Sequence, residues 1–103
     1  MHMVLTGDHI NANEALNSGL VAKVYDDDEQ LMEQTLKMAN GIANKGRISV
    51  MMAKEAVNAS LELSLSEGLR LERRLFHSLF ATNDQKEGMA AFLEKRKPEF
   101  TNK

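Results

Sequence analysis

The segment from Arg47 to Leu61 constrains the fold most strongly, because it has almost no polar face. Its apolar positions are Ile48, Val50, Met51, Met52, Ala53, Ala56, Val57 and Ala59. At helical spacing they leave only a narrow polar stripe at Lys54, Asn58 and Glu62. A helix of this kind must be covered on most of its sides. The other helices available to a chain of 103 residues could hardly cover it, so we infer a larger assembly, either the rest of a domain or other subunits.

Capping signals predict two helices before this segment. Asn11 followed by Glu14 is typical of a capping box, and it opens a short helix that Gly19 closes in the left-handed conformation. Asp27 with Gln30 indicates the start of a helix over Glu29–Asn44, which ends at the break Asn44-Lys45-Gly46. Between them, the apolar and partly β-branched residues Leu20–Val24 predict one short strand.

Two more helices follow. Ser64 with Glu67 predicts a capping box that opens a helix with an apolar stripe. That stripe consists of Leu65, Leu69, Phe76 and Phe80, with Leu71, Leu75 and Leu79 beside it. Thr82 with Gln85 starts the last helix, whose final turn is predicted to hold Lys95-Arg96-Lys97 before Pro98 stops it. The fold class expected from the pattern is mostly α, with one short strand near the start.

Composition limits the possible partners. The net charge of −2 is too small to indicate nucleic acid or an anionic membrane as a partner, and no apolar run reaches the roughly 20 residues that cross a bilayer. There is no cysteine, which excludes disulfides and thiolate sites. With 43% apolar and 27% charged residues, we expect a folded chain with a modest core. Residues 1–5 resemble no targeting signal, so Met1 is expected to be internal to a longer protein.

No arrangement of residues in the sequence indicates catalysis. His2, His9 and His77 lack metal-ligand spacing, and no phosphate-binding glycine loop or nucleophile elbow is present. The aspartates Asp26–Asp28 lack the spaced ligands of a calcium loop and favour a helix start instead. The glutamates are expected to be caps or solvated residues. We therefore expect neither a catalytic residue nor a metal site in this chain.

The basic residues Lys95-Arg96-Lys97 leave two interpretations open. Cations near a helix C-terminus interact favourably with its dipole, by about 0.3–1 kcal/mol each. The alternative is phosphate binding, with Phe92 one turn earlier offering an apolar contact. Physical reasoning alone favours the first interpretation.

The last helix also carries a family resemblance. EGMAAFLEKRKPEF, residues 87–100, resembles the ending of the crotonase (enoyl-CoA hydratase/isomerase) superfamily, with its Glu-Gly pair, phenylalanine, Lys-Arg pair and proline. MHMVLTGDHINANEALNSGLVAKVYDDDEQL at the start resembles the family's Thr-Gly-x-x-Ile and Gly-Leu-Val stretch. AKEAVNASLELSLSEGLRLERRLF and FATNDQKEGMAAF resemble the helices between. The resemblance covers essentially the whole chain, and within the superfamily it is closest to the mitochondrial short-chain enoyl-CoA hydratases.

The resemblance implies a C-terminal portion of that fold. Residues 1–28 would be the end of the ββα spiral core, a helix and a strand. Residues 29–103 would be the helical trimerisation region, in a family that forms trimers and hexamers. It also implies the mitochondrial matrix as the compartment.

The implied activity of the parent is addition of water to 2-enoyl-CoA thioesters in fatty acid β-oxidation, with the CoA thioester as substrate and no separate cofactor. The family's two catalytic glutamates and its oxyanion hole would lie upstream of Met1. The residues that match ligand contacts are Phe76 and Phe92, near the acyl-pantetheine part, and Lys95, near the adenine and phosphates. The alternatives are another crotonase-type enzyme, an isomerase or a hydrolase, and a stand-alone helical association module.

Overall fold

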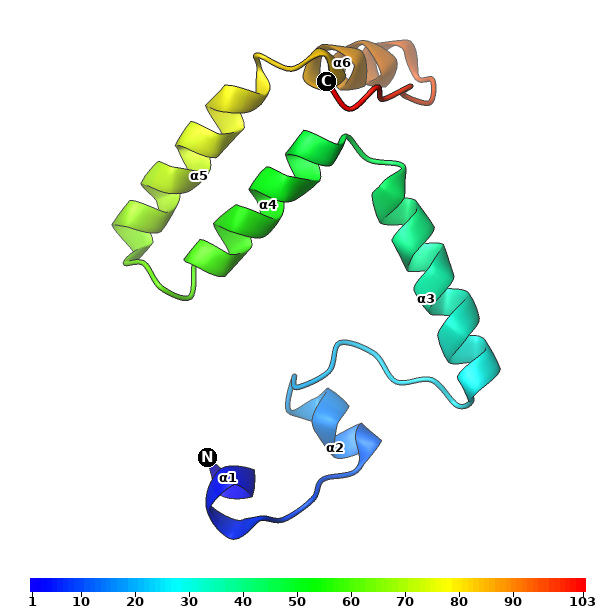
Figure 1. Ribbon diagram of the computed structural model, residues 1–103, viewed down its shortest axis with the longest axis vertical. Coiled ribbons are helices and arrows are strands. Elements are labelled where there is room, and N and C mark those ends of the chain that lie inside the picture. The colour runs from blue at the N-terminus through cyan, green and yellow to red at the C-terminus, as the bar shows by residue number, and fades with distance from the viewer. The chain divides into compact units, whose positions relative to one another are not determined.

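The computed structural model describes all residues from Met1 to Lys103 and contains six helices and no strand (Figure 1). The helices are α1 (His2–Thr6), α2 (Ala12–Asn17), α3 (Asp28–Ala43), α4 (Arg47–Ala59), α5 (Leu65–Leu79) and α6 (Asn83–Glu94). The chain divides into two units, residues 1–38 and 39–103. The mostly helical fold expected from the sequence is confirmed.

The predicted boundaries of α2 are confirmed by its hydrogen bonds. The Asn11 side chain accepts a bond from the Glu14 N–H at 2.9 Å, and the Glu14 carboxylate accepts one from the Asn11 N–H at 2.9 Å. Gly19, at φ 73°, then reverses the chain, and the Leu20 N–H donates to the Ala15 carbonyl at 2.9 Å. The left-handed conformation explains the glycine, since a Cβ would be strained there.

The predicted strand at Leu20–Val24 is wrong for this chain, because these residues form bends and irregular backbone. A strand needs a neighbour to pair its N–H and C=O groups, and no segment of the chain supplies one. The N–H groups of Leu20 and Val21 instead donate to the Ala15 carbonyl, at 2.9 and 3.3 Å.

The aspartates before α3 start a helix, as expected. The Asp27 carboxylate accepts a hydrogen bond from the Gln30 N–H at 2.7 Å, and the Gln30 side chain accepts one from the Asp26 N–H at 3.2 Å. Asp28 is the first residue of the helix. These three carboxylates therefore stabilise a helix N-terminus.

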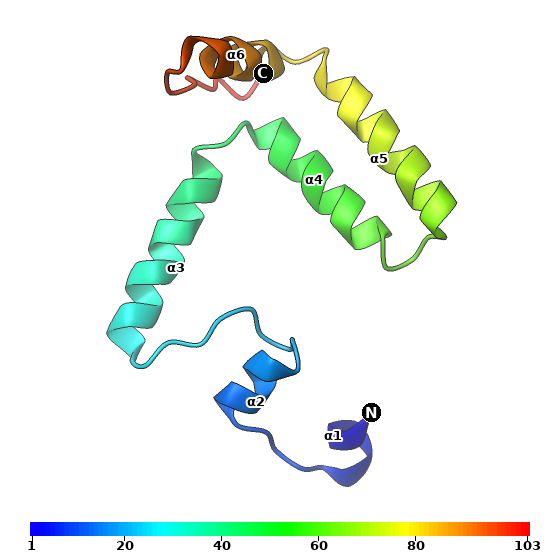
Figure 2. The ribbon, with the colours of Figure 1, turned by 180° about the vertical axis from the view of Figure 1, so that it is seen from behind.

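Helices α4 and α5 lie side by side and are the one pair of helices that packs extensively (Figures 1 and 2). The Ser64 hydroxyl accepts a bond from the Glu67 N–H at 3.4 Å and so caps α5, as predicted. The reciprocal bond of the predicted capping box is not formed, because the Glu67 carboxylate pairs with Arg70 at 3.2 Å. Only one of the two hydrogen bonds of the predicted capping box is therefore formed.

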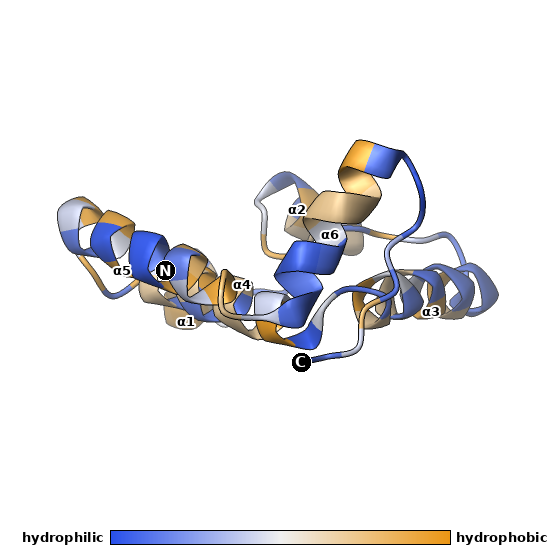
Figure 3. Ribbon diagram, turned by 90° about the horizontal axis from the view of Figure 1, so that it is seen from above, coloured by the Kyte–Doolittle hydropathy of each residue, from blue (hydrophilic) through white to orange (hydrophobic).

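The modest core expected from the composition is not formed. Ala15 is the only buried apolar residue of the first unit, and Ala91 is the only one of the second. On α4, Met51 and Val57 are 58% and 67% exposed. Figure 3 shows hydrophobic residues distributed along the ribbons of α4 and α5. The expectation that α4 requires cover from outside the chain agrees with this exposure, since α5 packs against only part of it.

Helix α6 ends three residues earlier than predicted. The Thr82 hydroxyl accepts from the Gln85 N–H at 3.2 Å and caps the start, as expected. The last helical residue is Glu94, and Lys95 at φ 55° takes the left-handed position that glycine usually occupies. The Lys95-Arg96-Lys97 triplet therefore lies beyond the final turn, because the chain must reverse there to run back along the helix.

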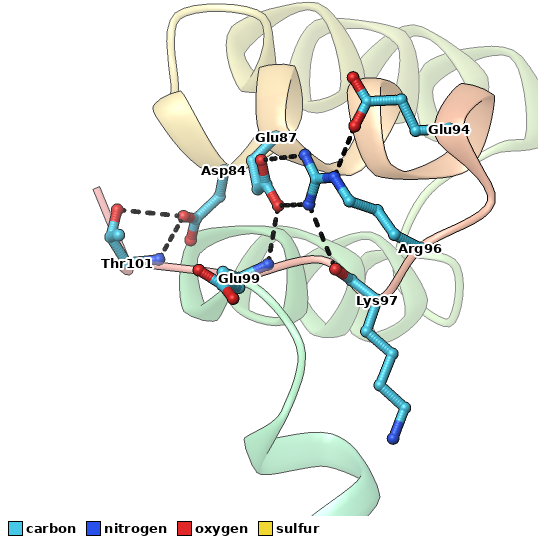
Figure 4. A network of polar contacts seen from close by, with 7 residues as sticks. All are labelled: Asp84, Glu87, Glu94, Arg96, Lys97, Glu99 and Thr101. Carbon is cyan, nitrogen blue, oxygen red and sulfur yellow. Dashed lines mark hydrogen bonds and ion pairs between the residues drawn. The ribbon is translucent and has the colours of Figure 1, made fainter.

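The returning tail is held against α6 by one glutamate (Figure 4). The Glu87 carboxylate accepts two bonds from the Arg96 guanidinium, at 2.5 and 3.0 Å, and one from the Glu99 N–H at 2.8 Å. Arg96 also pairs with Glu94 at 2.6 Å. A Cβ at Gly88 would lie 3.5 Å from the Phe100 ring, so the tail also follows the helix closely at that point.

These hydrogen bonds shift the pKa values of Glu87 and Arg96. The hydrogen bond from Arg96, and then that from the Glu99 N–H, lower the pKa of Glu87 from 4.5 to about 2. Its carboxylate therefore stays ionised well into the acid range. The bonds to Glu87 and Glu94 raise the pKa of Arg96 in turn.

We expect the tail to become less stable in acid. Because the pKa of Glu87 is lowered on folding, its stabilising contribution is complete above pH 4.5 and is lost as the pH falls from 4.5 through about 2. Glu87→Gln should remove the contribution at neutral pH, and the stability difference between wild type and variant should shrink over that window. Thermal unfolding at several pH values measures the difference. Glu55→Gln, at an exposed glutamate without an ion pair, is the matched control.

Candidate functional site

Three residues were predicted to contact a ligand, and all three are exposed. Phe76 lies on α5 and Phe92 on α6, with 58% and 79% of their surfaces accessible. Lys95 follows directly after α6. No aromatic or polar contact joins Phe76 to either of the other two. The chain therefore presents these residues on two separate elements of its second unit.

Phe76 belongs to an aromatic group at the end of α5. Its ring meets that of Phe80 edge to face, with the centroids 5.4 Å apart, and the His77 ring is 6.1 Å away. The exposed faces of Phe76 and Phe80 leave apolar area for another molecule to cover. His77 was expected to be a partly buried residue of the helix, but it is exposed.

An open apolar groove of 530 Å³ runs between α4 and α5. Its walls include Met52, Ala56, Val57, Leu69 and Phe76. Such a lining suits an apolar group, and Ser49, Glu72 and Arg73 are the polar residues of the groove. Phe76 is thus both a predicted ligand contact and part of this wall.

The structure separates the three basic residues after α6 into two kinds. Arg96 is engaged by Glu87 and Glu94, so its charge is neutralised within the chain (Figure 4). The ammonium groups of Lys95 and Lys97 form neither an ion pair nor a hydrogen bond. The triplet directly follows the helix C-terminus, where the dipole interpretation still applies, and Lys95 and Lys97 are also the cations available to an anion.

Lys95 also has an unfavourable backbone. A left-handed conformation costs a residue with a Cβ roughly 1–2 kcal/mol, and glycine avoids this cost. The turn itself is well made, since the Arg96 N–H donates to the Ala91 carbonyl at 3.0 Å and the Lys95 N–H to the Phe92 carbonyl at 3.3 Å. Glycine at this position would adopt the same conformation without that cost.

Sequence reasoning missed Asp84. It is 4% exposed, and its carboxylate accepts bonds from the N–H groups of Thr101 and Asn102 at 2.7 and 2.9 Å. The partners are 17 and 18 residues away, so no local spacing reveals them. The only signal was an acidic residue in the first turn of a helix, which is usual at any helix start.

No catalytic arrangement is present among these residues. His2 pairs with Asp8 at 3.2 Å on the surface, and no three histidine or acidic side chains are placed to hold a metal ion. None of the six helices combines the length and apolar character needed to cross a bilayer.

The chain matches known proteins over its whole length. The family described as enoyl-CoA hydratase/isomerase matches residues 1–103. The chain is 58% identical over 103 residues to a probable mitochondrial enoyl-CoA hydratase of Dictyostelium discoideum, covering 100% of this chain and 37% of that protein. It is also 58% identical over 103 residues to a probable enoyl-CoA hydratase of Rhizobium meliloti (strain 1021), covering 100% of this chain and 40% of that one.

A solved structure agrees. An enoyl-CoA hydratase from Bacillus anthracis superposes with a TM-score of 0.91 at 35% identity, covering 99% of this chain and 39% of that chain. The chain thus spans 37–40% of the length of these proteins. The sequence match and the shared helical fold lead to one conclusion: the chain belongs to the enoyl-CoA hydratase/isomerase family.

Proposed function

We propose that the chain acts as the C-terminal helical part of an enoyl-CoA hydratase, where it joins subunits and completes the CoA pocket. The observation that carries this proposal is the exposure of the apolar faces of α4, α5 and α6 in a chain that spans 37–40% of its relatives. Faces of this kind need a cover, and the remainder of such a protein and neighbouring subunits would supply it. Residues 29–103 would form the assembly region, and residues 1–28 the end of the spiral core.

The proposed reaction is addition of water to a 2-enoyl-CoA thioester, as in fatty acid β-oxidation. The CoA thioester is the substrate, and no separate cofactor is required. The two glutamates that handle water and the oxyanion hole would lie outside this chain. Glu87 is unsuited to such work, because a carboxyl group with a pKa of about 2 neither donates nor takes up a proton readily at neutral pH.

The ligand contacts would come from three exposed residues. Phe76 and Phe92 offer apolar surface to the acyl-pantetheine arm, and Lys95 offers a free ammonium to the phosphates. Support for Lys95 comes from its unpaired charge. Arg96 is excluded from this role by its own ion pairs.

The other enzyme of this family that deserves comparison is an isomerase. The family description includes both activities, whereas the two curated relatives above are named as hydratases. Those names favour the hydratase over an isomerase or a hydrolase. The match over residues 1–103 also favours the family over a stand-alone helical module.

For the compartment we propose the mitochondrial matrix. The Dictyostelium relative is named mitochondrial, and the relative from Rhizobium comes from a bacterium.

The chain alone should not hydrate crotonyl-CoA, because it lacks the groups that activate water. Loss of the enoyl absorbance, followed with the purified chain and with a protein that joins it to a complete hydratase core, tests this. We expect turnover only from the second protein. Turnover by the purified chain that persists through further chromatography would contradict the proposal.

Lys95→Glu in the complete enzyme should weaken binding of the CoA thioester. Replacing a favourable exposed charge contact by a repulsive one should raise the KM for crotonyl-CoA roughly three- to tenfold and change kcat little. Lys95→Gly should raise the KM less while raising the melting temperature, because glycine relieves the left-handed backbone. The control is Lys86→Glu, at an exposed lysine within α6. An unchanged KM in Lys95→Glu would refute the phosphate contact.

The apolar face of α4 should drive association. We expect the purified chain to form oligomers in light scattering, and the complete enzyme to form the trimers or hexamers usual in the family. Val57→Asp places a charge on the exposed apolar face of α4. It should shift both the purified chain and the complete enzyme toward smaller oligomers. Asn58→Asp, the same change in charge on the polar stripe, should not. A chain that stays monomeric at high concentration speaks against this role.

A further inference from the structure

The tail beyond α6 is fastened to the start of that helix by a single buried carboxylate. Asp84 Oδ1 accepts the Thr101 N–H at 2.7 Å and lies 3.4 Å from the Thr101 hydroxyl (Figure 4). Asp84 Oδ2 accepts the Asn102 N–H at 2.9 Å. The Lys103 carbonyl then accepts from the N–H groups of Asn83 and Asp84, at 2.8 and 3.2 Å. The first turn of α6 and residues 101–103 therefore form one hydrogen-bonded unit.

The same tail reaches the start of α4. Gly46, the N-cap of that helix, has no side chain with which to cap it. The Asn102 side chain supplies the missing acceptor, since its Oδ1 takes a bond from the Arg47 N–H at 3.0 Å. Asn102 thus bonds to both helices, through its backbone to Asp84 and through its side chain to α4. Its φ of 63° is one that asparagine tolerates better than most residues.

Gly46 and Asp84 are closely packed where the start of α4 meets the start of α6. A Cβ on Gly46 would lie 3.2 Å from Asp84 Oδ2 and 3.3 Å from Asp84 Cβ. The carboxylate therefore occupies the space that a side chain at the N-cap would fill. It also lies beside the N-termini of two helices, α4 and α6, where a negative charge is favourable.

The contacts between the tail, α4 and α6 hold α6 in place. Helix α6 shares no extensive packing with α4 or α5, because those two are the only pair that packs in this way. The short connection at residues 80–82 joins α6 to α5. The bonds of Asp84 to Thr101 and Asn102, and of Asn102 to the start of α4, link α6 to α4. The residues of this link are Asp84, Thr101 and Asn102, together with Gly46, which packs against the Asp84 side chain. We call these four residues the tail latch. The direction of α6, and with it the placement of Phe92 and Lys95, depends on them.

We propose that Asp84 is a positioning residue for the CoA site, holding α6 through the tail latch so that Phe92 and Lys95 meet the ligand. The inference rests on the proposed function of those two residues. Asp84 touches no ligand itself. A carboxylate suits the task because it accepts from three donors, whereas an amide in its place would turn an N–H₂ group toward one of them.

The test uses the complete hydratase with Asp84→Asn, and measures the KM for crotonyl-CoA, kcat and the dissociation constant of CoA. We expect the KM to rise roughly tenfold, since bonds to a buried charged group are lost, while kcat changes less than about twofold. Asn102→Ala should also raise the KM, and it leaves the Asp84 carboxylate intact. It therefore replaces Asp84→Asn as the test variant if Asp84→Asn folds poorly. Asp28→Asn, at the first-turn aspartate of α3, is the matched control.

A double variant separates positioning from a general loss of stability. If Asp84 acts by placing Lys95, then Lys95→Glu should raise the KM less in the Asp84→Asn protein than in wild type. Equal effects of Lys95→Glu in both backgrounds, or an unchanged KM in both Asp84→Asn and Asn102→Ala, would overturn the positioning role and leave the CoA site standing. An unchanged KM in Lys95→Glu alone would overturn the CoA site and the positioning role together.

Discussion

The helices of this chain carry more apolar surface than they can bury against one another, and the rest of the structure depends on that imbalance. Helices α4 and α5 share one face and leave an open apolar groove beside it. A single alanine is buried in each unit. In an ordinary domain, burial of large side chains supplies most of the favourable free energy of folding. Here that contribution has to come from outside the chain, which agrees with its span of 37–40% of its relatives.

In the second unit, hydrogen bonds supply part of the stabilisation that a hydrophobic core usually provides. Asp84 and Glu87 lie three residues apart, on the face of α6 along which the tail returns, and each accepts backbone N–H groups from that tail. Buried or partly buried carboxylates with several donors make directional contacts that hold a segment in one register. The cluster thereby gives the final residues a defined path despite the small buried area.

The apolar faces and the carboxylate contacts are suited to different roles in an enzyme of this family. The apolar faces are suited to assembly, because they are broad and lack direction. The carboxylate contacts are suited to orientation, because each fixes a particular pair of groups. Lys95 directly follows α6, next to an arginine that is paired with Glu87. The ammonium group of Lys95 forms no ion pair within the chain.

The sequence by itself determined the helices α2 to α6, the caps of four of them and the family, since capping, periodicity and spacing are local or depend on the order of residues alone. Helix α1 was not predicted. Asn11, Asp27, Ser64 and Thr82 all cap the helices predicted for them. The tertiary structure decided what depends on partners far along the chain or absent from it. Leu20–Val24 forms no strand without a neighbour, α6 stops at Glu94 because the tail turns back, and Asp84 finds its donors 17 and 18 residues away. Local patterns specify backbone preference, whereas pairing and burial require a second surface.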